Sequence, residues 1–132
     1  MSDPFAAKAA KPTLFQSVML RFPRALQEIA KVGVAGCEKY GVPLHDTSFL
    51  DVPGAYPRLT DAMMRHVVLE PIEGSVNIDP ADKGGYLHAA HAAWNAMARL
   101  EFALRERERA AAKAVSTLGL DCGILGDTDI AL

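Results

Sequence analysis

The chain has 132 residues, with 14 Lys and Arg against 16 Asp and Glu, so its formal net charge is −2. Domains usually hold about 100–150 residues, and this length predicts one domain with a hydrophobic core. The near-neutral charge argues against a partner bound through nucleic-acid phosphates. No apolar run reaches the ~20 residues of a membrane span, no signal-peptide stretch is present, and Cys37 and Cys122 fit neither a disulfide framework nor a zinc site. We therefore expect a cytoplasmic protein with no membrane partner.

The first predicted helix follows a tail and an apolar lead-in. Residues 1–12 mix small and polar side chains and are predicted to be flexible. Pro23 suits the first position of a helix, and apolar side chains three and four residues apart predict a helix over residues 24–40. Gly33 and Gly36 inside this helix lower its propensity, which indicates close approach of another backbone or of a ligand.

Two more helices are predicted along the chain. A proline-rich connection precedes a helix over residues 59–69, which Pro71 is predicted to end. After a loop, a long helix without Gly or Pro is predicted over residues 86–115. No strand-like alternation stands out, so we predict an all-α fold: one domain over residues 13–115, a small bundle of about three main helices completed by dimerisation. Residues 116–132 are expected to be a C-terminal tail or extension.

Polar side chains lie on the apolar faces of the two later helices. In the second helix His66 follows Leu59 by seven residues, so an imidazole shares the face of an apolar residue. In the third helix His88, His91 and Asn95 form one stripe. The alanines around this stripe leave room for a closely packed helix or for a bound group.

The first helix adds two carboxylates, Glu28 and Glu38, that could point inward. Helical bundles build metal sites from facing helices at such spacings. Carboxylates favour Mg²⁺ or Mn²⁺, and imidazoles shift the preference towards Mn²⁺, Zn²⁺ or Fe. The alternative interpretation is structural: the histidines are hydrogen-bonded core residues, the glutamates are solvated, Trp94 anchors a core or a dimer, and Asp79 and Asp82 are turn residues.

Three segments carry a family resemblance: GCEKYG at 36–41, RLTDAMMRHV at 58–67 and GGYLHAAHAAWNAMARLE at 84–101. Over about residues 23–104 the chain resembles the phage-encoded family named for the N-terminal domain of dATP/dGTP diphosphohydrolase. That family is grouped with the all-α nucleoside triphosphate pyrophosphohydrolases similar to MazG. Those enzymes hold Mg²⁺ on helix carboxylates in an ExxE…ExxD arrangement and split a nucleotide into monophosphate and pyrophosphate.

The resemblance matches Glu38, Lys39, Arg65, His66, Asp79, His88, His91, Trp94 and Asn95. We expect one or more divalent ions, Mg²⁺ or Mn²⁺ with Zn²⁺ as an alternative, to be held by His66, Asp79, His88 and His91 together with Glu28 or Glu38. Of these, His66 and His91 are also the expected catalytic groups. The nucleotide is expected to contact Lys39, Arg65, Trp94 and Asn95.

The carboxylate motif of the group is incomplete here. Residues 70–73 have the ExxE spacing, but Pro71 is predicted to end the helix after the first glutamate. Residues 79–82 have an acidic pair at the right spacing, but in a loop.

Three functional hypotheses follow. The first is a metal-dependent dATP/dGTP-type diphosphohydrolase that acts on the nucleotide pool in a phage-infected host cytoplasm. The second, which the incomplete motif favours, is a protein that binds a nucleotide or a nucleotide signal without catalysis. The third is a structural or interaction protein whose histidines belong to the core.

Overall fold

The computed structural model describes residues 3, 5–11 and 13–119 of the chain. Its helices in chain order are α1 (Ala6–Ala9), a π-helical turn (Phe15–Met19), α2 (Pro23–Tyr40), a 3₁₀ turn (Ser48–Leu50), α3 (Ala55–Glu73) and α4 (His88–Thr117). Within these described residues there is no strand, and the one β-bridge pairs Val76 with Leu87. The predicted all-α fold with three main helices is confirmed.

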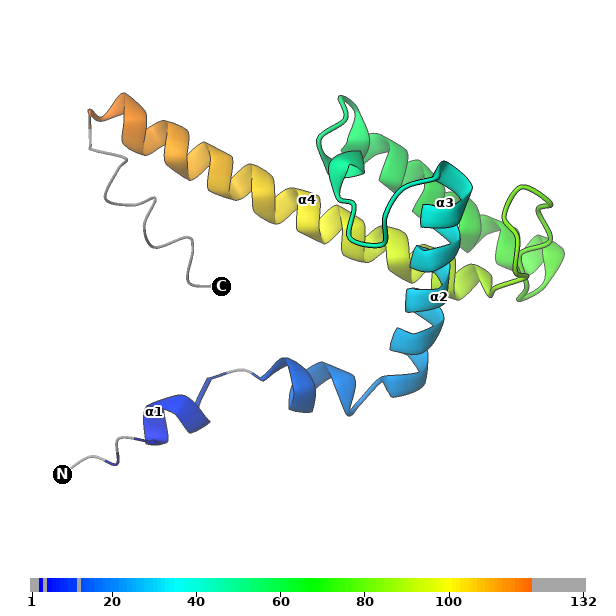
Figure 1. Ribbon diagram of the computed structural model, residues 1–132, viewed down its shortest axis with the longest axis horizontal. Coiled ribbons are helices and arrows are strands. Elements are labelled where there is room, and N and C mark those ends of the chain that lie inside the picture. Colours follow the sequence, from blue (N-terminus) through cyan, green and yellow to red (C-terminus); the bar gives the residue numbers. More distant parts are fainter. Residues whose placement is uncertain (1–2, 4, 12, 120–132) are drawn as a thin grey trace.

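Helix α2 begins and ends where the sequence predicts. Pro23 occupies the first position, where a missing amide hydrogen costs no helical hydrogen bond. Gly41 closes the helix with a φ of 64°, a left-handed conformation that glycine adopts without strain. Figure 1 shows α2 crossing α4, on which it packs.

Helix α3 is longer than predicted at both ends. The prediction that Pro71 ends the helix is wrong, because α3 continues to Glu73. A proline this close to the last turn removes only one helical hydrogen bond, the one to the carbonyl of Val67. At the other end Pro57 lies in the first turn, where the amide has no helical acceptor, so it also fits the helix.

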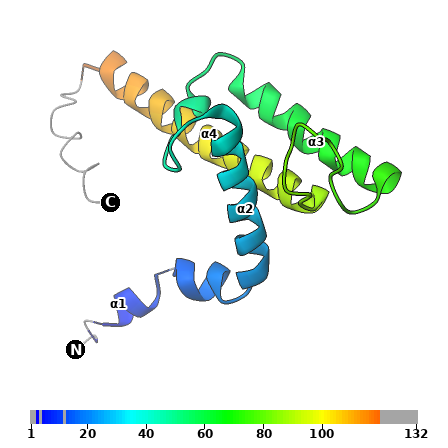
Figure 2. The ribbon, with the colours of Figure 1, turned by 45° about the vertical axis from the view of Figure 1, so that its right-hand side comes forward.

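Helix α4 is the longest element, with 30 residues, and lies within two residues of its predicted bounds. Its first half packs along α3, and the two helices run side by side in both views (Figures 1 and 2). Its last turns, orange in Figure 1, extend past the other helices. No helix of the described residues is long and apolar enough to cross a membrane.

The interior between the helices is as polar as it is apolar. The buried apolar side chains are Val32, Leu50, Ala55, Ala90 and Ala98. The buried polar side chains are His66, Asn77, His88, His91 and Asn95. Buried polar groups cost free energy unless they are hydrogen-bonded, so a polar cluster in so small a core marks the part of the fold to examine for function.

The two glycines inside α2 have different surroundings. A Cβ on Gly33 would lie 3.0 Å from the indole Nε1 of Trp94, whereas a Cβ on Gly36 would meet nothing within 4 Å. The predicted close approach is therefore found at Gly33 only, and the approaching group is a side chain of α4. The same indole packs on Phe49, with ring centroids 5.4 Å apart.

Candidate functional site

The contact between α3 and α4 brings three imidazoles together. His66 comes from the middle of α3, and His88 and His91 come from the first turn of α4. The rings of His66 and His91 are stacked, with centroids 4.4 Å apart and an interplanar angle of 11°. The rings of His66 and His88 are 5.3 Å apart, and all three side chains are buried. The histidines that sequence spacing placed on two separate helix faces thus form one cluster.

A hydrogen-bonded chain links this cluster to a carboxylate. Nδ1 of His66 lies 3.0 Å from Nδ1 of His88, and Nε2 of His88 lies 2.9 Å from Oε2 of Glu73. His88 is fully enclosed, with 0% of its surface exposed. Both of its ring nitrogens therefore have a partner, as a buried polar side chain requires.

The loop between α3 and α4 contributes Asn77, of which only 3% is exposed. Its amide Nδ2 donates to Oδ2 of Asp82 at 3.2 Å and contacts Nε2 of His91 at 3.3 Å. Its Oδ1 accepts from the backbone N–H of Asp79, and its own backbone N–H donates to the carbonyl of Tyr86. Asn77 therefore holds the loop closed against the imidazoles.

The end of α2 reaches the same loop through an ion pair. Nζ of Lys39 donates to Oδ1 of Asp82 at 3.0 Å. This hydrogen bond raises the pKa of Lys39. Burial alone would raise the pKa of Asp82, but hydrogen bonds from Lys39 and Asn77 lower it overall. A lysine ammonium is thus fixed close to the imidazole cluster.

Two of the three imidazoles, those of His66 and His91, are neutral at pH 7. Burial, and then the proximity of His91 and Arg65, lower the pKa of His66 to about 4. Burial also lowers the pKa of His91, although the nearby Asp82 opposes the shift. Neutral imidazoles can accept a proton or bind a metal ion, but they do not attract phosphate as cations do.

The side chains of the predicted carboxylate ligands make no hydrogen bond to the imidazoles among the described residues. Glu28 pairs with Lys31 of the same helix at 2.7 Å. Glu38 is exposed near the end of α2. Asp79 is also exposed, and its Oδ1 accepts from the backbone N–H of Ala81, as in a turn.

The predicted nucleotide contacts divide into two groups. Lys39 and Arg65 are exposed cationic side chains, and Arg65 directly precedes His66 on α3. Asn95 is buried and donates from Nδ2 to the carbonyl of His91 at 2.9 Å. Trp94 packs between α2 and the 3₁₀ turn, which favours a place in the core over contact with a nucleotide base.

A resident metal ion needs several donor side chains directed at one point. The described residues contain no group of three or more His, Cys, Asp or Glu side chains placed to hold one. His66 and His88 face each other through Nδ1, and Nε2 of His88 and of His91 face Glu73 and Asn77. Within one chain, these groups satisfy each other and do not fit a closed metal site.

Three residues of the cluster were not predicted as functional from the sequence. Glu73 lies seven residues after His66 and therefore on the same helix face. This relation is missed from the sequence because the predicted helix ends before Pro71. Asp82 has only a structural role, as a turn residue, in the alternative interpretation of the sequence, whereas its carboxylate pairs with Lys39. Asn77 carries no periodic signal, because its position depends on the path of the loop.

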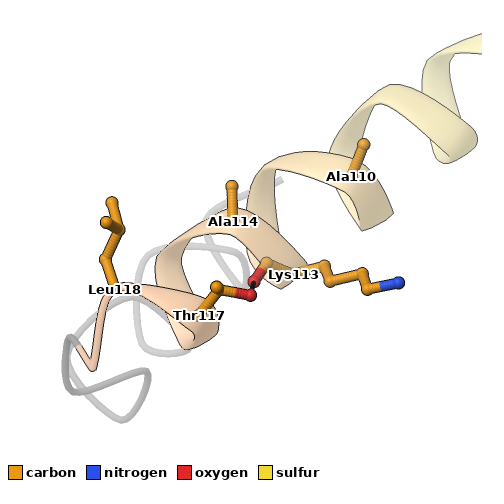
Figure 3. A pocket seen from close by; sticks show the side chains of 5 residues that line it. All are labelled: Ala110, Lys113, Ala114, Thr117 and Leu118. Carbon is orange, nitrogen blue, oxygen red and sulfur yellow. Dashed lines mark hydrogen bonds between the residues drawn. The ribbon is translucent and has the colours of Figure 1, made fainter.

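A hollow lies near the end of α4, away from the imidazole cluster, as Figure 3 shows. Its lining comes from one helix face and the residue that follows, and consists of Ala110, Lys113, Ala114, Thr117 and Leu118. It offers one cationic group and no carboxylate or imidazole. The imidazole cluster therefore remains the candidate site.

The fold and the cluster define a small α-helical domain with a buried imidazole–carboxylate site between α3 and α4. A family model described as dATP/dGTP diphosphohydrolase, N-terminal, matches residues 3–112, and the chain belongs to this family. The matched region contains all of α2 and α3 and every residue of the imidazole cluster. No curated protein and no solved structure matches the chain.

Proposed function

We propose that this protein is a diphosphohydrolase that converts dATP or dGTP into the monophosphate and pyrophosphate. The observation that carries the proposal is the cluster of neutral, buried imidazoles beside Lys39 and Arg65, inside the region matched by the family. General bases in phosphoryl-group hydrolysis must be unprotonated and within reach of the attacking water. His66 meets the first of these requirements at pH 7.

The proposed reaction starts with a water molecule held by the imidazoles. One proton of the water moves to His66, and the water oxygen forms a bond to the α-phosphorus. The bond between this phosphorus and the oxygen that bridges to the β-phosphate then breaks, and pyrophosphate leaves. The negative charge of the phosphates raises the proton affinity of His66 when the substrate is bound, so a pKa of about 4 in the free protein is no obstacle.

Two cationic side chains are proposed to bind the phosphates. Arg65 presents a planar group that matches two phosphate oxygens at once. Lys39 would exchange part of its contact with Asp82 for a phosphate oxygen, since the two groups are only 3.0 Å apart. Asn95 holds the carbonyl of His91 and would act by fixing that part of α4.

We propose that Mg²⁺ or Mn²⁺ enters with the nucleotide as part of the substrate, with Zn²⁺ as the alternative ion. Mg²⁺ in phosphate-binding proteins usually keeps several waters and is held by one or two carboxylates together with the substrate phosphates. This mode of binding needs no closed set of protein ligands. It agrees with the described residues, in which no three His, Cys, Asp or Glu side chains are arranged to hold a metal ion.

The test is a hydrolysis assay of purified protein with the four dNTPs and ATP, in the presence of Mg²⁺ or Mn²⁺. We expect pyrophosphate release from dATP or dGTP, and a loss of at least 100-fold in kcat for His66→Gln and for His91→Ala. His45→Gln is the matched control, because His45 is an exposed histidine of the loop that follows α2. No turnover with any nucleotide and metal pair would refute the proposal.

The second candidate function is nucleotide binding without hydrolysis. The observation that favours it is again the lack of an assembled group of three metal ligands in the described residues. Under this hypothesis dATP or dGTP binds and is recovered unchanged after hours with Mg²⁺ or Mn²⁺. Calorimetric titration followed by chromatography of the released nucleotide separates the two functions.

We also propose that the protein works as a homodimer or a larger homo-oligomer in the cytoplasm, the host cytoplasm if it is phage-encoded, where nucleotides are available. The support for this proposal is a stripe of apolar side chains exposed on α3, made of Met64, Val67, Val68 and Ile72. An exposed apolar surface of this kind is typical of a face that a partner covers.

A further inference from the structure

The directions of the hydrogen bonds around the imidazoles determine which ring nitrogen carries each proton. Glu73 lies at one end of the network, and its carboxylate can only accept hydrogen bonds. Since Nε2 of His88 lies 2.9 Å from Oε2 of Glu73, this nitrogen carries a proton and donates it. The pairing of Glu73 with His88 thus fixes one end of the network.

His88 and His66 share a hydrogen bond between their Nδ1 atoms. His88 is fully enclosed and lies beside the imidazole of His66, so we take its ring in the uncharged form, which needs no hydration. A neutral imidazole with a proton on Nε2 has a lone pair on Nδ1. Because the two Nδ1 atoms are 3.0 Å apart, His66 must donate from Nδ1. The neutral ring of His66 therefore has its lone pair on Nε2.

Asn77, from the loop between α3 and α4, determines the tautomer of His91. The backbone N–H of Asp79 donates to Oδ1 of Asn77, which fixes the orientation of the amide. Its Nδ2 then donates both to Asp82 and to Nε2 of His91, so Nε2 of His91 accepts. A neutral His91 consequently carries its proton on Nδ1.

We propose that the stacked pair has divided roles: His66 accepts a proton at Nε2, and His91 donates a hydrogen bond from Nδ1–H. Glu73 and Asn77 are the positioning residues that enforce these tautomers. In the described part of the chain, no fully buried side-chain nitrogen or oxygen lacks a hydrogen-bond partner. Nε2 of His66 and Nδ1 of His91 have no hydrogen-bond partner among the described residues, so these two nitrogens are not fully buried. They remain accessible to water or to a ligand.

The catalytic roles of Nε2 of His66 and Nδ1 of His91 rest on the proposed function. In that reaction Nε2 of His66 takes the proton of the attacking water. The resulting positive charge is stabilised through His88 by the carboxylate of Glu73. His91 donates from Nδ1–H to an oxygen of the phosphate under attack, where negative charge develops.

The tautomers can be read in the ligand-free, full-length protein by long-range ¹H–¹⁵N NMR at pH 7.5. We expect Nδ1–H forms for His66 and His91 and an Nε2–H form for His88, with exposed His45 as the internal reference. An Nε2–H form of His66, or a doubly protonated His88, would overturn the inference. This measurement does not depend on catalysis, so it separates the failure of the inference from the failure of the proposed function.

A matched pair of variants tests the positioning role of Glu73. Glu73→Ala removes the acceptor of His88 and is expected to give mixed tautomers at His88 and His66, with a 10- to 100-fold lower kcat and little change in KM. Glu70→Ala removes an exposed carboxylate one turn earlier on α3 and is expected to change neither. If Glu73→Ala does not fold, Glu73→Gln, which keeps an acceptor oxygen, is expected to retain the tautomers of the wild type. Unchanged tautomers in a folded Glu73→Ala protein would refute the role.

Discussion

His66 shows how a single residue acquires its chemistry from the fold. On α3 it is one polar side chain on a partly apolar face, but the packing of α4 encloses it beside two further imidazoles. Burial disfavours the charged form, which explains why the pKa of His66 falls to about 4. The same burial that makes the ring a neutral acceptor at pH 7 also makes the folded protein sensitive to acid.

We expect the stability to fall as the pH decreases from about 6.5 to about 4. An unfolded histidine binds a proton near pH 6.5, whereas folded His66 does so only near 4. Between these values the unfolded state binds more protons, so acid lowers the free energy of unfolding, by at most about 3 kcal/mol for this group. Urea unfolding at several pH values, followed by the fluorescence of Trp94, measures the slope.

Two variants show whether His66 causes this slope. His66→Gln has no group that titrates in the range and should flatten the dependence, although the lowered pKa of His91 leaves part of it. His45→Gln removes an exposed histidine and should leave the slope unchanged. Equal slopes in both variants and in the wild type would contradict the assignment.

Asn77 is expected to be a second sensitive position. Asn77→Ala would leave Asp82, the buried His91 and the backbone N–H of Asp79 without their partner. We expect a loss of about 2–3 kcal/mol in the free energy of unfolding. Asn95→Ala is the control, because it replaces a buried asparagine with a single side-chain hydrogen bond, made to its own helix. A similar loss for both variants in urea unfolding would be inconsistent with the role of Asn77.

At the scale of elements, the regular parts of the fold are predictable and the irregular parts are not. The bounds of α2 follow from Pro23 and Gly41, whose effects are local. The predicted helix end at Pro71 is wrong because this proline removes only one hydrogen bond near the end of α3. The packing of α3 on α4 outweighs that loss. The outcome depends on tertiary contacts that periodicity does not contain.

The same distinction applies to the candidate site. The stripe of His88, His91 and Asn95 is visible in the sequence because helical spacing places these residues on one face. Its completion by Asn77 depends on a loop of irregular conformation, held by one bridge between Val76 and Leu87. The conformation of a loop depends on such long-range contacts. Local sequence patterns therefore do not predict which loop side chains reach the site.

The packing of α2 on α4 is testable at its two internal glycines. Gly36→Ala should stabilise the protein by about 0.5–1 kcal/mol, because alanine favours the helix and its Cβ meets nothing within 4 Å. Gly33→Ala should lose this gain and destabilise, because its Cβ would lie 3.0 Å from Nε1 of Trp94, which packs on Phe49. Urea midpoints of the two variants give the comparison. If Gly33→Ala is as stable as Gly36→Ala, the indole is not confined as described.

At the scale of the whole molecule, large apolar side chains remain on the surface in helical register. On α3 the exposed stripe consists of Met64, Val67, Val68 and Ile72, with exposed fractions from 47% to 72%. On α4, Met97 and Leu100 are exposed by 52% and 62% and are spaced three residues apart. Stripes of this kind on helices that also pack together are typical of surfaces that a further helix covers.

The last prediction concerns the partner that covers these stripes. If it is a second copy, sedimentation velocity at micromolar concentration should show a dimer or larger species. Val68→Glu should then shift the protein to monomers, because a carboxylate in an apolar interface loses its hydration without a partner.

Leu44→Glu is the matched control, since Leu44 is an apolar residue exposed by 72% in the loop after α2, outside both stripes. Circular dichroism distinguishes dissociation from unfolding, because the helices themselves do not depend on Val68, which is 53% exposed within one chain. A wild-type protein that is monomeric at 100 µM, or a Val68→Glu protein that assembles as the wild type does, would show that copies of this chain do not cover the stripe.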